Sequence, residues 1–118
     1  MALSPTQLTL KRLREEGWSP WIVEVWNPHS RTRQDLWNFG DILAQRLDSP
    51  PLIIQTTSYS NVSARKKKIL DNEDAYIWVQ AGNLLDIHGW HKKPIKKGGK
   101  AMRWQVRVES IYPEDFNY

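Results

Sequence analysis

Polar side chains within two apolar, strand-like runs are the residues of this sequence that could do chemistry. Asp41 lies within the apolar run 36–47, and a second apolar run, 52–57, follows it. Gln55 and Thr57 are two residues apart, so on a strand they share a face that a buried strand usually fills with Val or Ile. Buried polar groups are costly unless they are paired, bind a ligand or take part in chemistry. If the two runs pair, Asp41 lies beside the other two side chains and the three outline a small metal site on a sheet.

The composition is that of one soluble globular domain, residues 1–118. The chain is 40% hydrophobic and 25% charged, and its length is enough for one apolar core. It has no apolar run near the roughly 20 residues of a membrane-spanning helix, and its N-terminus lacks the features of a secretory signal. It has no cysteine, which excludes disulfides and thiolate metal sites. We therefore expect no membrane contact and a cytoplasmic location.

The charge favours a polyanionic partner. The net charge is +4, and the basic excess gathers in segments 31–33, 65–68 and 92–100. Such clusters favour nucleic acid, although they could also be solvated loops. The basic residues that we expect to contact phosphates are Arg31, Arg33, Arg65, Lys66, Lys92, Lys93, Lys96 and Lys97. Four of the seven tryptophans stand among basic residues and could stack on bases, although core packing is the commoner role: Trp26, Trp37, Trp90 and Trp104.

The pattern of caps, breakers and apolar periodicity predicts a mixed α/β domain. Ser4, Pro5 and Gly17 are start and stop signals for a first helix. The expected helices are 5–17, 61–71 and 73–81, and the expected strands are 21–26, 36–47 with a bend at Gly40, 52–57, 84–91 and 102–111. A polar loop is expected at 27–34, a flexible basic loop at 92–100 and a poorly fixed tail from Tyr112. The order α-β-β-β-α-α-β-β predicts one sheet with helices packed on it.

The order of these elements and the residues around Asp41 resemble the PD-(D/E)XK nuclease superfamily. That family has a core of order α-β-β-β-α-β, with an Asp on the second strand and Glu-x-Lys on the third. Asp41 matches the Asp, Gln55 stands at the Glu position and Thr57 at the Lys position. The segment 33–41, Arg-Gln-Asp-Leu-Trp-Asn-Phe-Gly-Asp, is similar to a phrase that precedes this Asp in small Holliday-junction-resolvase-like and VRR-NUC-like nucleases. Such nucleases are often found in phages and prophages, and in them Gln can replace the Glu.

The resemblance implies a restriction-endonuclease-like core and a metal-dependent DNA endonuclease that acts on branched or structured DNA. Its setting would be a prokaryotic or phage-infected host cell. Mg²⁺ or Mn²⁺ would be held by oxygen ligands, which hard cations prefer, from Asp41, Gln55, the backbone carbonyl of Thr56 and Glu24. Thr57 would orient a water molecule or replace a ligand. Two opposed cuts need two sites, so resolvase-like action implies a homodimer.

The sequence departs from the family at two catalytic positions. Glutamine is a neutral ligand, and threonine cannot replace an ammonium group. Lys68 or Arg65 on the following helix could supply that charge, or these basic residues could cover a solvated face. Glu24 could be a metal ligand or could pair with Arg33. The departures keep open a second function, in which a nuclease fold has lost catalysis and binds DNA or a protein partner.

Two further carboxylates have two interpretations each, and two histidines are weak candidates for a zinc site. Asp35 could be a metal ligand or a loop residue that bonds backbone amides. Glu16 is the carboxylate nearest to the acid that resolvase-like relatives place on the first helix, or it is a solvated helix end. His88 and His91 are three residues apart, so on a strand they face opposite sides and make a poor zinc pair.

Overall fold

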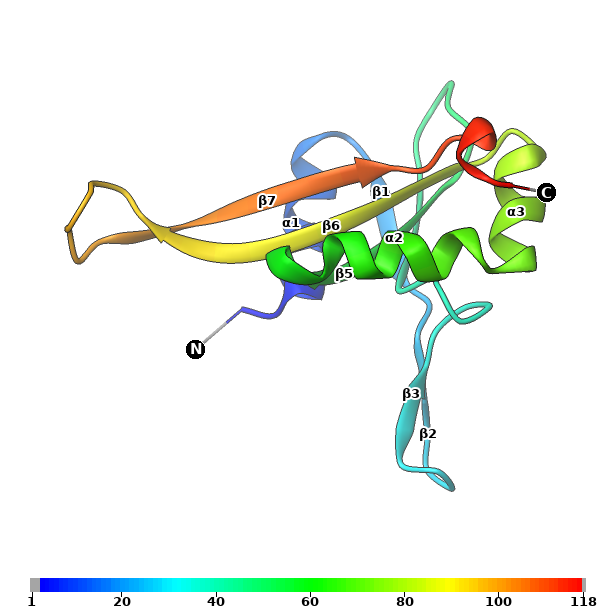
Figure 1. The fold of residues 1–118 in the computed structure, drawn as a ribbon, viewed down its shortest axis with the longest axis horizontal. Coiled ribbons are helices and arrows are strands. Elements are labelled where there is room, and N and C mark those ends of the chain that lie inside the picture. Colours follow the sequence, from blue (N-terminus) through cyan, green and yellow to red (C-terminus); the bar gives the residue numbers. More distant parts are fainter. Residues whose placement is uncertain (1–2, 118) are drawn as a thin grey trace.

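The structure, a computed structural model, describes residues 3–117 and consists of a mixed sheet with helices on both faces (Figure 1). The helices are α1 (Pro5–Glu15), α2 (Val62–Leu70) and α3 (Glu73–Gln80). The main sheet contains β1 (Ser19–Ile22), β4 (Ile42–Gln45), β5 (Leu52–Ser58), β6 (Leu84–Pro94) and β7 (Met102–Ser110). A separate hairpin contains β2 (Val25–Asn27) and β3 (Thr32–Gln34), and two 3-10 turns are η1 (Tyr59–Asn61) and η2 (Pro113–Asp115).

The strand order of the main sheet is β1-β4-β5-β6-β7. Only β5 and β6 run parallel, and α2 and α3 form the long crossover between them that a parallel pair requires. The other neighbouring pairs are antiparallel. The predicted mixed α/β architecture, one sheet flanked by helices, is therefore confirmed. No helix between residues 3 and 117 is long and apolar enough to cross a bilayer.

Helix α1 covers one face of the sheet. Gln7 N–H donates to the Ser4 hydroxyl at 3.2 Å, so Ser4 caps the helix as its position before Pro5 predicts. Leu10 and Leu13 of α1 pack on Ile42 of β4 and Ile54 of β5. Helices α2 and α3 cover the opposite face. Their buried residues Val62, Ile69, Ala75 and Val79 pack on Ile53 of β5 and on Leu85 and Ile87 of β6. Strand β5 is thus buried on both faces, as predicted.

The predicted strand 21–26 is wrong in extent, and so is the predicted loop 27–34. The chain forms β1, leaves the sheet at Val23 and Glu24, and then forms the β2–β3 hairpin, which projects from the body (Figure 1). The physical reason lies in the turn: the side-chain oxygen of Asn27 accepts the N–H groups of His29 and Ser30. This Asx-type turn reverses the chain.

The predicted strand 36–47 is also wrong, because only Ile42–Gln45 is a strand. Leu36 and Gly40 exchange backbone hydrogen bonds of 2.8 and 2.9 Å and close a tight reversal. Trp37 and Asn38 both have positive φ, 51° and 66°. A left-handed tryptophan costs roughly 1 kcal/mol. Packing of its ring on Phe39 and Trp78 offsets that cost.

The predicted basic loop and the predicted loose tail both need correction. Strand β6 continues to Pro94 and pairs there with Met102, so only residues 95–101 connect the long β6–β7 hairpin. The tail is held in place: Phe116 is 8% exposed and its ring lies 5.6 Å from that of Tyr76. Gln80 Nε2 also donates to the carbonyl of Pro113 at 3.1 Å, so a hydrogen bond and an apolar contact both fix this segment.

Helix α2 approaches β6 closely at Gly89. A Cβ atom there would collide with the side chain of Val62 and would lie 3.0 Å from the carbonyl oxygen of Ser58. We predict that Gly89→Ala lowers the free energy of unfolding by roughly 1 to 3 kcal/mol, because overpacking forces the backbone to shift. Urea denaturation measures this, and a variant as stable as the wild type would contradict it.

Candidate metal site

Three carboxylates from separate loops converge beside the end of β5. Oxygen atoms of Glu24, Asp35 and Asp41 all lie within 4.8 Å of one another. Glu24 lies between β1 and β2, Asp35 follows β3, and Asp41 precedes β4. The β2–β3 hairpin and the reversal 36–40 therefore bring the three together. A cluster of acidic residues in this arrangement could bind a metal ion.

Asp41 is 6% exposed and is oriented by β5. Its Oδ2 accepts the backbone N–H of Thr56 at 2.7 Å and the Thr56 hydroxyl at 3.2 Å. The Thr56 hydroxyl oxygen also lies 2.9 Å from the hydroxyl oxygen of Thr6 on α1. The backbone N–H of Asp41 donates to the carbonyl of Ile54 at 3.0 Å. The two bonds from Thr56 hold the carboxylate in one orientation, and Thr6 of α1 fixes the Thr56 hydroxyl in turn.

The pKa of Asp41 is raised to about 7, chiefly by burial. The neighbouring carboxylates of Asp35 and Glu24 contribute to this rise, and the hydrogen bond from the Thr56 backbone opposes it. Three crowded carboxylates repel one another at neutral pH. A bound cation would relieve this repulsion, so the electrostatics of the site suit a metal ion.

Gln55 supplies a fourth oxygen. Its side chain is 3% exposed, and its Oε1 is buried with no hydrogen-bond partner among the described residues. Gln55 lines a hollow of about 280 Å³ together with the three carboxylates, here called the acid hollow. An unpaired buried carbonyl is costly, and a metal ion would satisfy it. The donor set, three carboxylates and one amide oxygen, fits a hard divalent cation.

The cations predicted near the site separate into two groups. Arg65 on α2 lines the acid hollow, whereas Lys68 lines a neighbouring hollow between α2 and the β2–β3 hairpin. Arg33 also lines the acid hollow, and its Nη1 contacts Glu24 Oε1 at 2.8 Å. The predicted pairing of Glu24 with Arg33 is therefore confirmed, and Glu24 also belongs to the acidic cluster, so its role as a metal ligand stays a prediction.

The structure changes the expected roles of Thr57 and Asp35. Thr57 is buried and does not line the acid hollow, whereas Thr56 does. Asp35 lies in the carboxylate cluster, where the sequence favoured an ordinary loop role. Its place in the segment 33–41 was the available signal. The sequence spacing of Asp35 and Asp41 does not predict that the two carboxylates meet, because it does not reveal the chain reversal between them.

The remaining predicted residues lie on the two hairpins and on α2. Lys66 pairs with Glu109 of β7 at 2.8 Å, so its charge is already matched. The others are exposed: Arg31 in the turn between β2 and β3, and Lys92, Lys93, Lys96 and Lys97 around the tip of the β6–β7 hairpin. Strand β5 ends at Ser58, which pairs with Trp90, and β6 continues to Pro94. The basic hairpin thus extends beyond the end of β5 that carries Thr56.

Glu16 and the two strand histidines lie outside the acid hollow. Glu16 pairs with Arg12 at 3.4 Å on α1. His91 stacks on Tyr59 at 3.8 Å and bonds Gln105, whereas His88 is buried on the α1 side, so the two histidines face opposite sides as their spacing predicts. Comparison with protein-family models, curated proteins and solved structures gave no match to this chain.

Replacing Asp41 by Asn tests the electrostatics of the site. The pKa of Asp41 is raised from 3.8 to about 7 on folding, so its contribution to stability is full below pH 4 and is lost as the pH rises through 7. In chelator at pH 8, Asp41→Asn should raise the free energy of unfolding by roughly 1 to 3 kcal/mol. The gain should shrink at pH 5.

Asp48→Asn is the matched control, because Asp48 is exposed and its φ of 60° is one that asparagine adopts readily. Urea denaturation at the two pH values measures both variants. Equal effects for the two variants, or a gain from Asp41→Asn that is larger at pH 5, would show that the Asp41 carboxylate is not strained by its surroundings.

Proposed function

We propose that this protein is a metal-dependent DNA endonuclease with a restriction-endonuclease-like core. The observation that carries the proposal is the convergence of Glu24, Asp35 and Asp41 around a hollow that is also lined by Gln55, whose side-chain oxygen is unpaired. Mg²⁺ and Mn²⁺ are the ions that favour such oxygen ligands and that serve phosphodiester hydrolysis.

Each residue of the acid hollow has a role in this proposal. A divalent ion held there would polarise the phosphate and lower the pKa of an attacking water molecule. Asp41 and Gln55 would hold the ion, and the bond from Thr56 would keep Asp41 in place. Arg65 would face the phosphate and offset the charge that develops on it.

The missing Glu-x-Lys of the family has structural replacements. Gln55 brings no charge to the third strand, and Asp35 brings a carboxylate to the same hollow. Thr57 cannot replace the lysine, and Arg65 provides a cation that lines the hollow. In this proposal the second carboxylate and the cation of the family motif are supplied by Asp35 and Arg65, from other positions in the chain. This supports catalysis with a rearranged set of residues.

The two hairpins suggest which kind of DNA structure the protein would act on. They project from the body in different directions (Figure 1), and the β6–β7 hairpin carries the exposed lysines at its tip. Trp26 of β2 is 56% exposed and lies opposite Arg33 in the hairpin register. An exposed aromatic ring beside a basic residue suits stacking on an unpaired base. Branched or otherwise structured DNA is the proposed substrate, and a homodimer would provide two opposed cuts.

A second candidate function is DNA binding without cleavage. The ion pair between Arg33 and Glu24 favours it, because an arginine at 2.8 Å already neutralises one carboxylate of the cluster. In that case the acid cluster and Arg33 would fix the hairpin, and the lysines would bind phosphates.

Cleavage assays separate the two functions. Four-way junction, flap, single-stranded and duplex DNA are incubated with Mg²⁺, Mn²⁺ or chelator. We expect metal-dependent cleavage, with a loss of at least about 100-fold in Asp41→Ala and in Asp35→Ala, because each removes a ligand. Asp48→Asn, at an exposed turn residue whose positive φ asparagine adopts readily, is the control. Salt-sensitive binding with no cleavage in any metal would overturn the proposal in favour of the second function.

The position of the catalytic cation gives a separate prediction. Arg65→Ala should lower kcat by about 10- to 100-fold, because Arg65 lines the acid hollow. Lys68→Ala, one turn further along α2, should lower kcat by less than about threefold and act mainly on DNA affinity. Steady-state kinetics at saturating substrate measure both. A larger loss in Lys68→Ala would contradict the role assigned to Arg65.

A further inference from the structure

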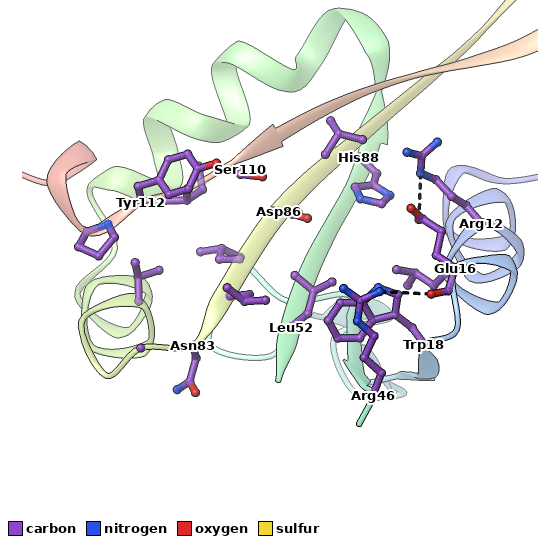
Figure 2. Close-up of a pocket in the computed structure, with 18 residues that line it drawn as sticks. Arg12, Glu16, Trp18, Arg46, Leu52, Asn83, Asp86, His88, Ser110 and Tyr112 are labelled. Carbon is purple, nitrogen blue, oxygen red and sulfur yellow. Dashed lines mark hydrogen bonds and ion pairs between the residues drawn. The ribbon is translucent and has the colours of Figure 1, made fainter. Parts of the chain in front are cut away.

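A second hollow lies on the α1 side of the sheet and is lined by an unpaired buried polar group. Among residues 3–117, the buried side-chain atoms with neither a hydrogen bond nor an ion pair are Gln55 Oε1 and His88 Nδ1, whereas Arg12 Nε lies 3.4 Å from Glu16 Oε1. Gln55 lines the acid hollow, and His88 and Arg12 line this second one, of about 430 Å³, here called the α1 hollow (Figure 2). Unpaired buried polar atoms are rare in native proteins, so their placement in hollows points to missing partners.

His88 is aimed into the α1 hollow by the alternation of β6. Ile87 packs in the core under α2 and α3, so Asp86 and His88, one residue to either side, face α1. His88 is 3% exposed. Figure 2 shows Asp86 and His88 pointing into the hollow from β6, with Arg12 and Glu16 facing them from α1.

The polar groups of the hollow are mixed in type and nearly balanced in charge. The pKa of His88 is lowered to about 4, chiefly by burial and in part by the nearby Arg12, so the imidazole is neutral and carries one donor and one acceptor. Burial raises the pKa of Asp86, and a hydrogen bond with Ser110 opposes this shift. Arg12 is already paired with Glu16 at 3.4 Å. The hollow therefore has no excess charge that would favour a polyphosphate or a free cation.

The walls of the hollow are mainly apolar and partly aromatic. They include Leu13, Trp18, Leu52, Leu85, Val108 and Ile111. Trp18 forms part of the floor, and the guanidinium of Arg46 lies 4.2 Å from its ring centre. Small-molecule sites have this character: a volume of about 300 to 1,000 Å³, apolar walls and a few polar groups that fix the orientation of the ligand.

We propose that the α1 hollow binds a neutral, planar heterocycle of nucleobase size, whose edge exchanges hydrogen bonds with Asp86, His88 and Arg12. A carboxylate, a neutral imidazole and a guanidinium together complement an edge that carries both donors and acceptors. Such an edge is the distinguishing feature of nucleobases. The site is separate from the acid hollow, so it does not depend on cleavage.

Binding of nucleosides to the intact protein, in chelator and without DNA, tests this proposal. Adenosine, guanosine, cytidine and uridine are titrated to millimolar concentration while the imidazole signals of the three histidines are followed by NMR. We expect at least one nucleoside to shift the His88 signals in a saturable way. The signals of His29 and His91 should not move, because these residues lie outside the hollow.

His88→Phe keeps an aromatic ring and removes the polar atoms, and it should weaken binding by at least about tenfold, as measured by calorimetry. Asp86→Asn provides the same readout with a nearly isosteric change, and His91→Gln on the opposite face of β6 is the matched control. Three results would overturn the proposal: no shift of His88 at millimolar nucleoside, equal binding by wild type and by both hollow variants, or a His88 partnered by ordered water only.

Discussion

The hydrogen bonds from Thr56 to the buried carboxylate of Asp41 connect all parts of the candidate site. They tie the chain that enters β4 to the middle strand of the sheet, and the Thr6–Thr56 contact extends this connection to α1. A carboxylate 6% exposed would be costly without such partners. With Asp41 fixed, the reversal 36–40 and the hairpin root place Asp35 and Glu24 against it. Removal of the Thr56 bonds would therefore loosen the whole cluster.

The candidate site places mutually repelling carboxylates next to a well-packed apolar core. Three carboxylates and an unpaired amide oxygen lie beside the apolar packing on both faces of β5, and of these four residues Gln55 alone belongs to a strand. Proteins tolerate such strain where it serves binding or catalysis. The basic hairpin on one side and Arg65 on the other provide the complementary charge for a phosphate chain. The same carboxylates thus lower the stability of the folded protein and would provide its proposed activity.

The sequence predicted elements whose signals are local and missed contacts that depend on distant packing. The burial of β5, the Ser4 cap of α1 and the existence of a strand near 102–111 follow from composition and periodicity. The reversal at Trp37 does not, because its positive φ is stabilised by rings far along the chain. The choice of Thr56 over Thr57 depends on which side chain meets the hollow where β5 ends. Asp35 gained its position only through that reversal.

The central claim is that Glu24, Asp35, Asp41 and Gln55 share one divalent ion. The most direct measurement is a crystal structure of the protein grown with Mn²⁺, with anomalous scattering recorded at the manganese edge. The account predicts a single strong peak in the acid hollow, about 2.0 to 2.4 Å from carboxylate oxygens of the cluster and within reach of Gln55 Oε1. The absence of a peak there at a saturating Mn²⁺ concentration, with Arg33 Nη1 still paired with Glu24, would contradict it.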